Sequence, residues 1–406
     1  MSKIWGIVII TAIALIVSLL VYPFVLRFAI KRKIFDNPGA RKLQKTPVPV
    51  FGGVGVYLGI IAAIGVSFFI MRSGVMVYGL IAMTAMLLIG VWDDIAGLSP
   101  YIRLLAEILV VLFIMFVVGA SIDDFHGLWG IHRIGLKWSI PLSLIAGVGI
   151  INAINLIDGV NGYSSGFGIM ACFFFGIAFF LTRNFSMGTL CFATGAALIP
   201  FFLHNVFGKS SRMFIGDGGT LMLGTLLTLC VFCTLSHNSP SAALESKGVG
   251  LVAFTLAVLG IPVFDTLRVM ARRMIRGKSP FHPDKTHLHH IFIDCGFSHI
   301  GTSVTILALQ FLLVLIWYLS WKLGASIDWQ LYIVVFYSLL VTFAFYSTMR
   351  LSQKRKGRLY RSFVGFGRIM HINQRPPFKK IRKFIDRNAL GINYYKKMKD
   401  EDSHPS

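Results

Sequence analysis

Long uninterrupted runs of apolar residues are the feature that most restricts how this chain can fold. About eleven runs of roughly 17 to 23 residues recur along it, and a helix of that length crosses the ~30 Å hydrocarbon layer of a membrane. Of the 406 residues, 55% are hydrophobic and only 14% are charged, which is too few charges for a water-soluble surface. We therefore predict an all-α polytopic integral membrane protein and exclude a water-soluble enzyme, a disordered chain, a coiled coil and a secreted scaffold.

The expected membrane-spanning helices follow these runs. They lie near 4–26, 53–71, 76–92, 101–119, 139–155, 166–182, 188–204, 218–235, 249–267, 301–321 and 329–349. The first run follows a single Lys3 and has no small-residue cleavage site after it, so we expect a retained helix rather than a signal peptide. Gly55 and Gly59 form a G-x-x-x-G pair in the second run, which predicts a close helix contact.

The 39 Lys and Arg residues fall almost entirely on one side of the expected membrane. If the N-terminus lies outside, 31 of them are cytoplasmic and seven face the other side, with Arg103 at the start of the fourth span. The cytoplasmic segments are then 27–52, 93–100, 156–165, 205–217, 268–300 and 350–406. Because Lys and Arg accumulate in cytoplasmic loops, we place the N-terminus on the periplasmic face and the C-terminus in the cytoplasm.

The chain divides into a membrane domain, 1–349, and a basic cytoplasmic tail, 350–406. The tail carries sixteen basic and four acidic residues, interleaved with aromatic ones. A polybasic segment beside an anionic leaflet gains on the order of 1 kcal/mol per charge. Membrane lipid is therefore the partner that we expect for the tail, and nucleic acid is not.

Acidic residues gather on the cytoplasmic side, although membrane orientation depends on Lys and Arg and hardly on Asp and Glu. The motifs are Trp92-Asp93-Asp94, Asn152 to Gly162, Phe214-Ile-Gly-Asp-Gly-Gly219, and His287-Leu-His289-His290. Magnesium uses one or two carboxylates with phosphate oxygens, glycine lets the backbone approach phosphate, and imidazole donates to further oxygens. Taken alone, each motif is compatible with a helix cap, a turn, a helix end or a solvated loop, and the histidines with a zinc site. Four such motifs on one face predict a site for Mg²⁺, with Mn²⁺ as an alternative, and a phosphorylated ligand.

Glu107 is the acidic residue that lies inside a span. It follows Arg103 by four residues, so we expect an ion pair along one helix face with a structural role.

These motifs resemble those of the polyprenyl-phosphate N-acetylhexosamine-1-phosphate transferases, glycosyltransferase family 4, over about Asp36 to Phe297. The resemblance includes Asp36-Asn-Pro-Gly-Ala-Arg-Lys42 and Lys45-Thr-Pro-Val-Pro-Val-Phe-Gly-Gly53. The segment from Arg273 to His290 is similar to the branch that uses UDP-N-acetylglucosamine.

The resemblance implies roles for matching residues. Asp217 resembles the principal Mg²⁺ ligand, with Asn155 as a second one. Asp93 and Asp94 match an essential acidic pair. Asp158, Asn161 and Phe214 match positions around the uridine, and we also treat Asp158 as catalytic together with the acidic pair. His287, His289 and His290 match a motif for the diphosphate or sugar. Arg103 matches a basic position for the lipid phosphate, and Lys42 and Lys45 are implied phosphate contacts.

Two positions depart from the pattern. Asn161 stands where bacterial members usually have Asp, whereas the eukaryotic dolichol branch also has Asn at this position. Gln44 stands where several relatives have His. The second departure weakens any role for an imidazole in that loop.

The implied reaction transfers N-acetylglucosamine 1-phosphate from its UDP donor to a polyprenyl phosphate and releases UMP. Direct attack by the lipid phosphate, with Asp93 or Asp94 handling its proton, is the route that we favour over a covalent aspartyl phosphate. The alternative donors are another UDP-N-acetylhexosamine or UDP-N-acetylmuramoyl-pentapeptide, and a membrane transporter is the distant alternative. The resemblance also implies a bacterial inner membrane location with the site facing the cytoplasm, and it leaves a homodimer open.

Overall fold

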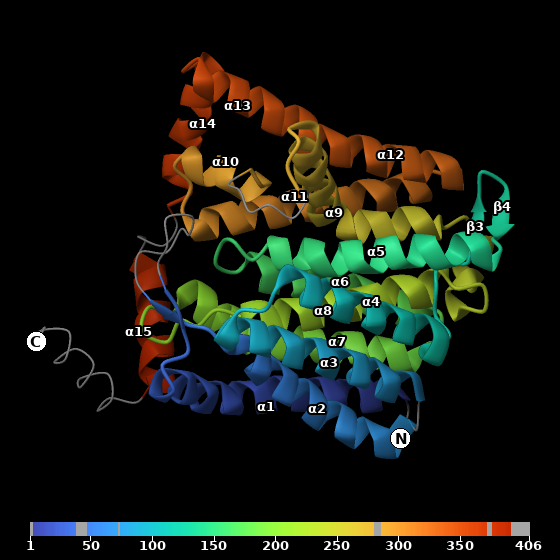
Figure 1. Ribbon diagram of the computed structural model, residues 1–406, viewed down its shortest axis with the longest axis horizontal. Helices are drawn as coiled ribbons and strands as arrows, with labels where there is room; N and C mark the ends of the chain where they lie inside the picture. The colour runs from blue at the N-terminus through green and yellow to red at the C-terminus, as the bar shows by residue number, and fades with distance from the viewer. Residues whose placement is uncertain (1–2, 38–46, 72–73, 280–285, 372–375, 391–406) are drawn as a thin grey trace, which may run out of the picture.

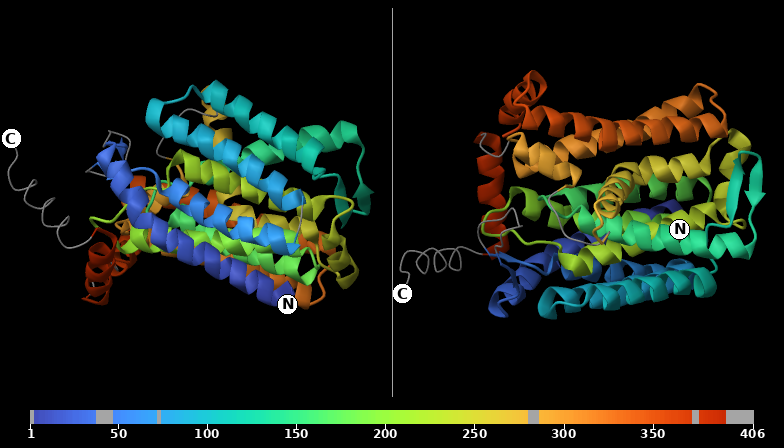
Figure 2. Two further views of the ribbon diagram at one scale, coloured as in Figure 1. Left: turned by 90° about the horizontal axis from the view of Figure 1, so that it is seen from below. Right: turned by 45° about the horizontal axis from the view of Figure 1, so that its top comes forward.

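The computed structural model describes residues 3–37, 47–71, 74–279, 286–371 and 376–390 of the chain. Most of the long helices run side by side in one bundle, and two helices near the C-terminus lie across one end of it (Figures 1 and 2). The helices are α1 Lys3–Lys31, α2 Gly52–Met71, α3 Gly74–Ala96, α4 Pro100–Phe113, α5 Leu136–Leu156, α6 Tyr163–Leu181, α7 Phe185–Phe207, α8 Gly216–Leu235, α9 Leu251–Ile275, α10 Leu288–Asp294, α11 His299–Lys322, α12 Ile327–Leu339, α13 Tyr346–Lys354, α14 Arg358–Ile369 and α15 Pro376–Leu390.

Ten helices of the described chain are long and apolar enough to cross a membrane, which confirms the prediction of a polytopic helical membrane protein. The expected span 53–71 corresponds to α2, whose apolar stretch Gly52–Ser67 is shorter. Two spans contain π-helical turns. One is Ile114–Val118, through which α4 continues, and the other is Leu340–Phe345, which joins α12 to α13.

Several helices extend beyond the apolar runs that predict them. The first expected span ends at 26 but α1 continues to Lys31, and α9 continues past 267 to Ile275. The added turns carry basic residues, which are favourable at a helix C-terminus and keep their charged ends in water.

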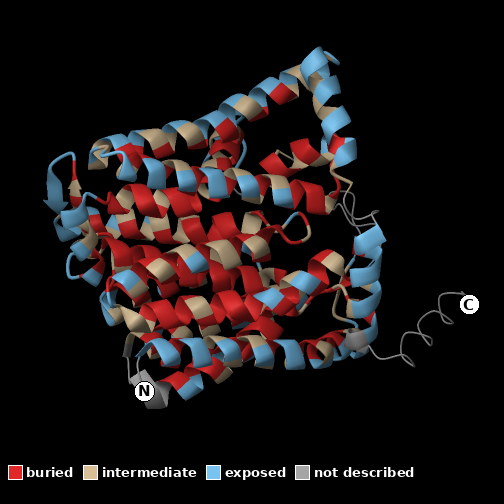
Figure 3. Ribbon diagram, turned by 180° about the vertical axis from the view of Figure 1, so that it is seen from behind, coloured by how far each residue is buried: buried red, intermediate tan, exposed pale blue. Residues whose placement is uncertain are grey.

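The centre of the bundle is α8. Within its most apolar window 94% of the residues are buried, against 22% for the α4 span (Figure 3). A helix that is apolar all round is suited to this central position. It packs against α2, α3, α5 and α9, so its N-terminus is surrounded by the ends of other helices.

The predicted G-x-x-x-G contact joins α1 and α2. A Cβ at Gly59 would lie 2.9 Å from the carbonyl oxygen of Ala14, and one at Gly55 would lie 3.8 Å from Val25. Both glycines therefore face α1, as the spacing predicts.

The two ends of the bundle differ. At one end lies a hairpin of β3 (Asp124–Leu128) and β4 (Ile131–Arg133), on the same side of the bundle as the start of α1 but well apart from it. At the other lie α10, α14 and α15, together with the small pair β1 (Phe35–Asp36) and β2 (Val48–Pro49). The strands are an addition to the all-α prediction. We call the second end the site end; its assignment to the cytoplasm stays a prediction, as does the division of the chain at 349.

Candidate active site

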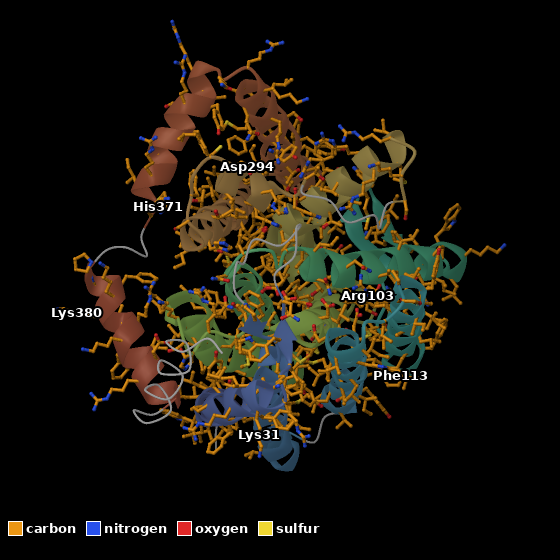
Figure 4. The ribbon with its side chains drawn as sticks, turned by 60° about the vertical axis from the view of Figure 1, so that its left-hand side comes forward. Lys31, Arg103, Phe113, Asp294, His371 and Lys380 are labelled. Carbon is orange, nitrogen blue, oxygen red and sulfur yellow. The ribbon has the colours of Figure 1, made fainter. Side chains whose placement is uncertain are left out.

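The polar motifs of the sequence meet at the site end, which Figure 4 shows from that side with Arg103 labelled. Hydrogen bonds connect the 92–94 motif with the 214–219 motif and the latter with Asn155, and close packing connects the 158–162 loop with the histidine segment. Segments that lie far apart in the sequence therefore share one location at the start of α8.

Asp94 anchors the first turn of α8. Its Oδ1 accepts the backbone N–H of Asp217 at 3.0 Å and its Oδ2 accepts that of Gly218 at 3.2 Å. These are helix N-terminal donors that have no partner within their own helix. Gly216 has φ +76°, and a Cβ there would come closer than 3.0 Å to the Asp94 carboxylate, so this turn requires glycine. Both oxygens of Asp94 are thus engaged in holding α8.

A second attachment comes from Pro49 and the first two residues of α2. The N–H of Phe214 donates to Pro49 O at 2.8 Å, and the N–H of Gly52 donates to Phe214 O at 2.9 Å. The N–H of Gly53 donates to Ile215 O at 2.8 Å. The backbone of Phe214 is fixed in this way, and its side chain is half-buried.

Asp217 lies among one amide, one carboxylate and one guanidinium. Asn155 donates its Nδ2–H to Asp217 Oδ1 at 2.9 Å. Asp93 and Arg103 both interact electrostatically with Asp217, and Arg103 Nη1 lies 3.5 Å from Asp93 Oδ2. Two carboxylates beside a single cation leave the group negative, which favours binding of a further cation.

This donor set fits Mg²⁺ shared with a phosphorylated ligand. Asp217 and Asn155 offer the hard oxygen ligands that magnesium prefers. Among the described residues no three His, Cys, Asp or Glu side chains gather as a metal site made by protein alone. Magnesium usually completes its shell with phosphate oxygens and water, so one or two protein ligands suffice.

Arg103 is held by a buried polar pair. Its Nε lies 3.6 Å from Oε1 of Glu107, which is 1% exposed, so the expected ion pair is present. Asn152 donates its Nδ2–H to the other oxygen of Glu107. Glu107 thus has the partners that a buried carboxylate needs. Its ion pair with Arg103 orients the guanidinium toward Asp93.

Asp158 and Gly159 link the central site to the histidine segment. The hydroxyl of Ser164 donates to Asp158 at 2.5 Å. Burial raises the pKa of Asp158 to about 7; the Ser164 hydrogen bond opposes this, and the charges of Asp217 and Asp36 add to it. A Cβ at Gly159 would come closer than 3.0 Å to the His289 ring, so the loop lies directly against this imidazole.

The rest of this loop is fixed through its backbone. The carbonyl oxygen of Asn161 accepts the Ser303 hydroxyl at 2.7 Å. The N–H of Gly162, which has φ +79°, donates to Asn205 Oδ1 at 2.7 Å. These two hydrogen bonds fix the end of the loop that begins with Asp158.

Asp265 organises the histidine segment, a role that the sequence analysis missed. Its Oδ2 lies 3.0 Å from His287 Nδ1, both its oxygens accept the N–H of Leu288 at 3.1 Å, and Arg268 Nη2 donates to its Oδ1 at 2.6 Å. Arg268 also donates to Thr286 O at 2.6 Å. The available signal was an Asp and an Arg three residues apart on one helix in a mostly apolar region, where ionisable residues are rare.

His289 is buried beside two other imidazoles. The ring centroids of His287 and His289 are 5.8 Å apart, and those of His289 and His290 are 4.3 Å apart. Burial, followed by the positive charges of His290 and His287, holds the pKa of His289 well below its usual value. His289 is consequently a neutral hydrogen-bonding group near pH 7. Lys42 and Lys45, the predicted phosphate contacts, lie outside the described residues.

Comparison with known proteins bears on the same region. The family model described as Glycosyl transferase family 4 matches residues 76–235. This stretch carries Asp93, Asp94, Asn155, Asp158 and Asp217.

Three curated relatives are similar over most of the chain. The undecaprenyl-phosphate alpha-N-acetylglucosaminyl 1-phosphate transferase of Yersinia pestis is 28% identical over 309 residues, covering 75% of this chain and 81% of the relative. The probable undecaprenyl-phosphate N-acetylglucosaminyl 1-phosphate transferase of Bacillus subtilis (strain 168) is 27% identical, covering 74% and 81%. The Escherichia coli (strain K12) protein with the same name as the Yersinia relative is 28% identical, covering 68% and 73%.

These similarities support the resemblance at the level of the family. The matched segment is the one in which Asp94, Asn155 and Asp217 meet, so the match and the geometry point to the same residues. They also bear out the prediction of an enzyme, since the matching family model and the named relatives are all described as transferases.

Proposed function

We propose that the protein transfers N-acetylglucosamine 1-phosphate from UDP-N-acetylglucosamine to undecaprenyl phosphate and releases UMP. The proposed setting is the bacterial inner membrane, with the site end facing the cytoplasm, as the first membrane step of a cell-envelope polysaccharide. The observation that carries the proposal is the cluster of Asp217, Asp93 and Arg103 at the start of α8. The names of the relatives supply the transferred group and the lipid acceptor, and the UDP donor comes from the resemblance.

The surroundings of Arg103 support a lipid acceptor. Arg103 lies on α4, the span with the smallest buried share, and its neighbours Tyr101, Leu105 and Leu109 are 84%, 56% and 57% exposed. In a membrane these side chains face lipid. A polyprenyl chain in the bilayer could therefore bring its phosphate to Arg103 from the side, while the nucleotide arrives from water.

The proposed reaction exchanges one phosphoanhydride for another. An oxygen of the lipid phosphate forms a bond to the sugar-bearing phosphorus of the donor, and the bond from this phosphorus to the bridging oxygen breaks, so that UMP leaves. Little driving force is available, so the chain must contribute positioning and charge neutralisation. Arg103 offsets the charge of the incoming phosphate. Mg²⁺ bound by Asp217 and Asn155 would neutralise charge on the diphosphate.

The two neighbouring aspartates have different roles in this proposal. Asp94 is occupied by two backbone N–H groups, which suits it to hold α8. Asp93 has an oxygen 3.5 Å from Arg103, which suits it to orient the lipid phosphate and accept its proton. An aspartyl-phosphate intermediate is the alternative route. Asp158, Asn161 and Phe214 are proposed to contact the uridine side of the donor, and His287, His289 and His290 the diphosphate or the sugar.

The test is UMP release by the purified protein with undecaprenyl phosphate and Mg²⁺. The donors are UDP-N-acetylglucosamine, UDP-N-acetylgalactosamine, UDP-glucose and UDP-N-acetylmuramoyl-pentapeptide. We expect fastest release with UDP-N-acetylglucosamine, dependence on the lipid, and loss with EDTA that added Mg²⁺ restores. Faster release with another donor would reassign the sugar, and no UMP with any donor would contradict the transferase.

A further inference from the structure

The C-terminal helices lie across the site end. We call residues 358–371 together with α15, 376–390, the strap. Figure 4 shows its two helices at the edge of the bundle, with His371 and Lys380 labelled. The sequence predicts only lipid contact for this segment, whereas in the structure it also contacts the bundle.

The first half of the strap packs on the segment that follows the histidines. The hydroxyl of Ser298 donates to Met370 O at 2.9 Å, and His371 Nε2 lies 2.7 Å from Gly296 O. A Cβ at Gly367 would come closer than 3.0 Å to Cys295 O, so the two backbones are in close contact. Cys295 directly follows α10, which carries His289 and His290.

The second half of the strap holds the loop that precedes Phe214. Asp386 Oδ1 accepts the N–H of Lys209 at 3.0 Å, the N–H of Ser211 at 3.0 Å and the Ser211 hydroxyl at 2.7 Å. The Phe378 and Phe207 rings stack with centroids 4.5 Å apart. This loop ends three residues before Phe214 and six before Asp217.

The charge of Asp386 has a structural reason. It is the one acidic residue in the described part of the strap, and it is 6% exposed although α15 is otherwise basic. A buried carboxylate is costly unless hydrogen bonds and opposite charge compensate for it. Burial and Arg382 lower the pKa of Arg212, and Asp386 opposes this, so Asp386 is a counter-charge for the loop.

We infer that Asp386 is a positioning residue that holds the 208–211 loop and, through it, the donor-binding segment at Phe214 and Asp217. The strap then connects two parts of the site, since its first half is attached behind α10. This inference rests on the proposed transfer reaction for its kinetic consequence. The attachment of the loop can be measured without it.

The activity-independent test uses a nitroxide at Lys209→Cys, an exposed position whose backbone bond to Asp386 the label leaves intact. The native cysteines are buried or half-buried. In the full-length protein, Asp386→Asn should lower the immobilised fraction of the spectrum at least twofold. Asp386→Glu should restore most of it, and Arg387→Gln, an exposed change on the same helix, should leave it unchanged. Equal spectra for the labelled protein without a further change, for its Asp386→Asn variant and for its Arg387→Gln variant would overturn the inference.

The kinetic test separates positioning from general damage. Asp386→Asn should raise the KM for the UDP-sugar about tenfold and should change kcat less. This factor corresponds to the loss of one hydrogen bond to a charged group. The KM for undecaprenyl phosphate should not change. Equal losses in kcat for all three variants would overturn the inference. If the unmodified protein releases no UMP, the proposed reaction fails, and the spin-label result alone decides whether Asp386 holds the loop.

Discussion

Replacing Gly53 by alanine tests whether the start of α2 positions the start of α8. A Cβ at residue 53 would come closer than 3.0 Å to both Cα and N of Gly219 and would lie 3.0 Å from Ile215 O. All three are backbone atoms, so no side chain can rotate away and the two helix ends must separate. Overpacking of this kind costs about 1–3 kcal/mol. Since Asp217 is two residues from Gly219, a shift of about 1 Å there should lower turnover by on the order of 100-fold.

Gly55→Ala is the matched control on the same helix. A Cβ at residue 55 meets only Val25, at 3.8 Å, which is ordinary van der Waals contact. We expect this variant within about 1 kcal/mol of the parent in stability, because alanine is also the better helix former, and close to it in turnover. The measurements are the initial rate of UMP release and the thermal unfolding midpoint in detergent. The same rate and midpoint for Gly53→Ala and Gly55→Ala would refute the reasoning.

The remaining predictions concern carboxylates. Asp217→Asn should abolish UMP release because the metal ligand loses its charge, and Asp94→Asn should do so because an amide cannot accept both N–H groups of α8. Asp123→Asn, at the hairpin end, is the control. Near-parent turnover of a correctly inserted Asp217→Asn or Asp94→Asn variant would contradict the role given to that aspartate. Burial raises the pKa of Asp158 from 3.8 to about 7 in the folded protein. The folded state therefore keeps the Asp158 proton up to a higher pH than the unfolded state does. The stability that the protonated Asp158 contributes is lost as pH rises from about 4 to about 7. Asp158→Asn should gain stability relative to the parent across that window and level off above it, measured as unfolding midpoints at a series of pH values, and parallel curves would argue against a buried Asp158.

Part of the site follows from sequence pattern and part does not. The motifs around Asp94, Asn155 and Asp217 are recognisable because acids and amides are unusual at the ends of apolar runs. The pattern does not distinguish Asp93 from Asp94, and only the contacts with α8 assign the second to the helix start. Asp265 is one acid among several in the sequence, and its function as the centre of the histidine segment depends on a neighbour 22 residues away.

The sequence by itself determined that this is a multi-pass membrane protein. Transfer of a side chain from water to lipid is a property of that side chain, and its free energy adds along a run, so composition in a window predicts a span. The tertiary structure decided which polar groups meet. Asp94 and Asp217 are separated by 123 positions and Asp386 and Ser211 by 175, and only packing of the helices brings each pair within hydrogen-bond distance. Such contacts arise from the shapes of all the intervening helices together, which no local window of sequence contains.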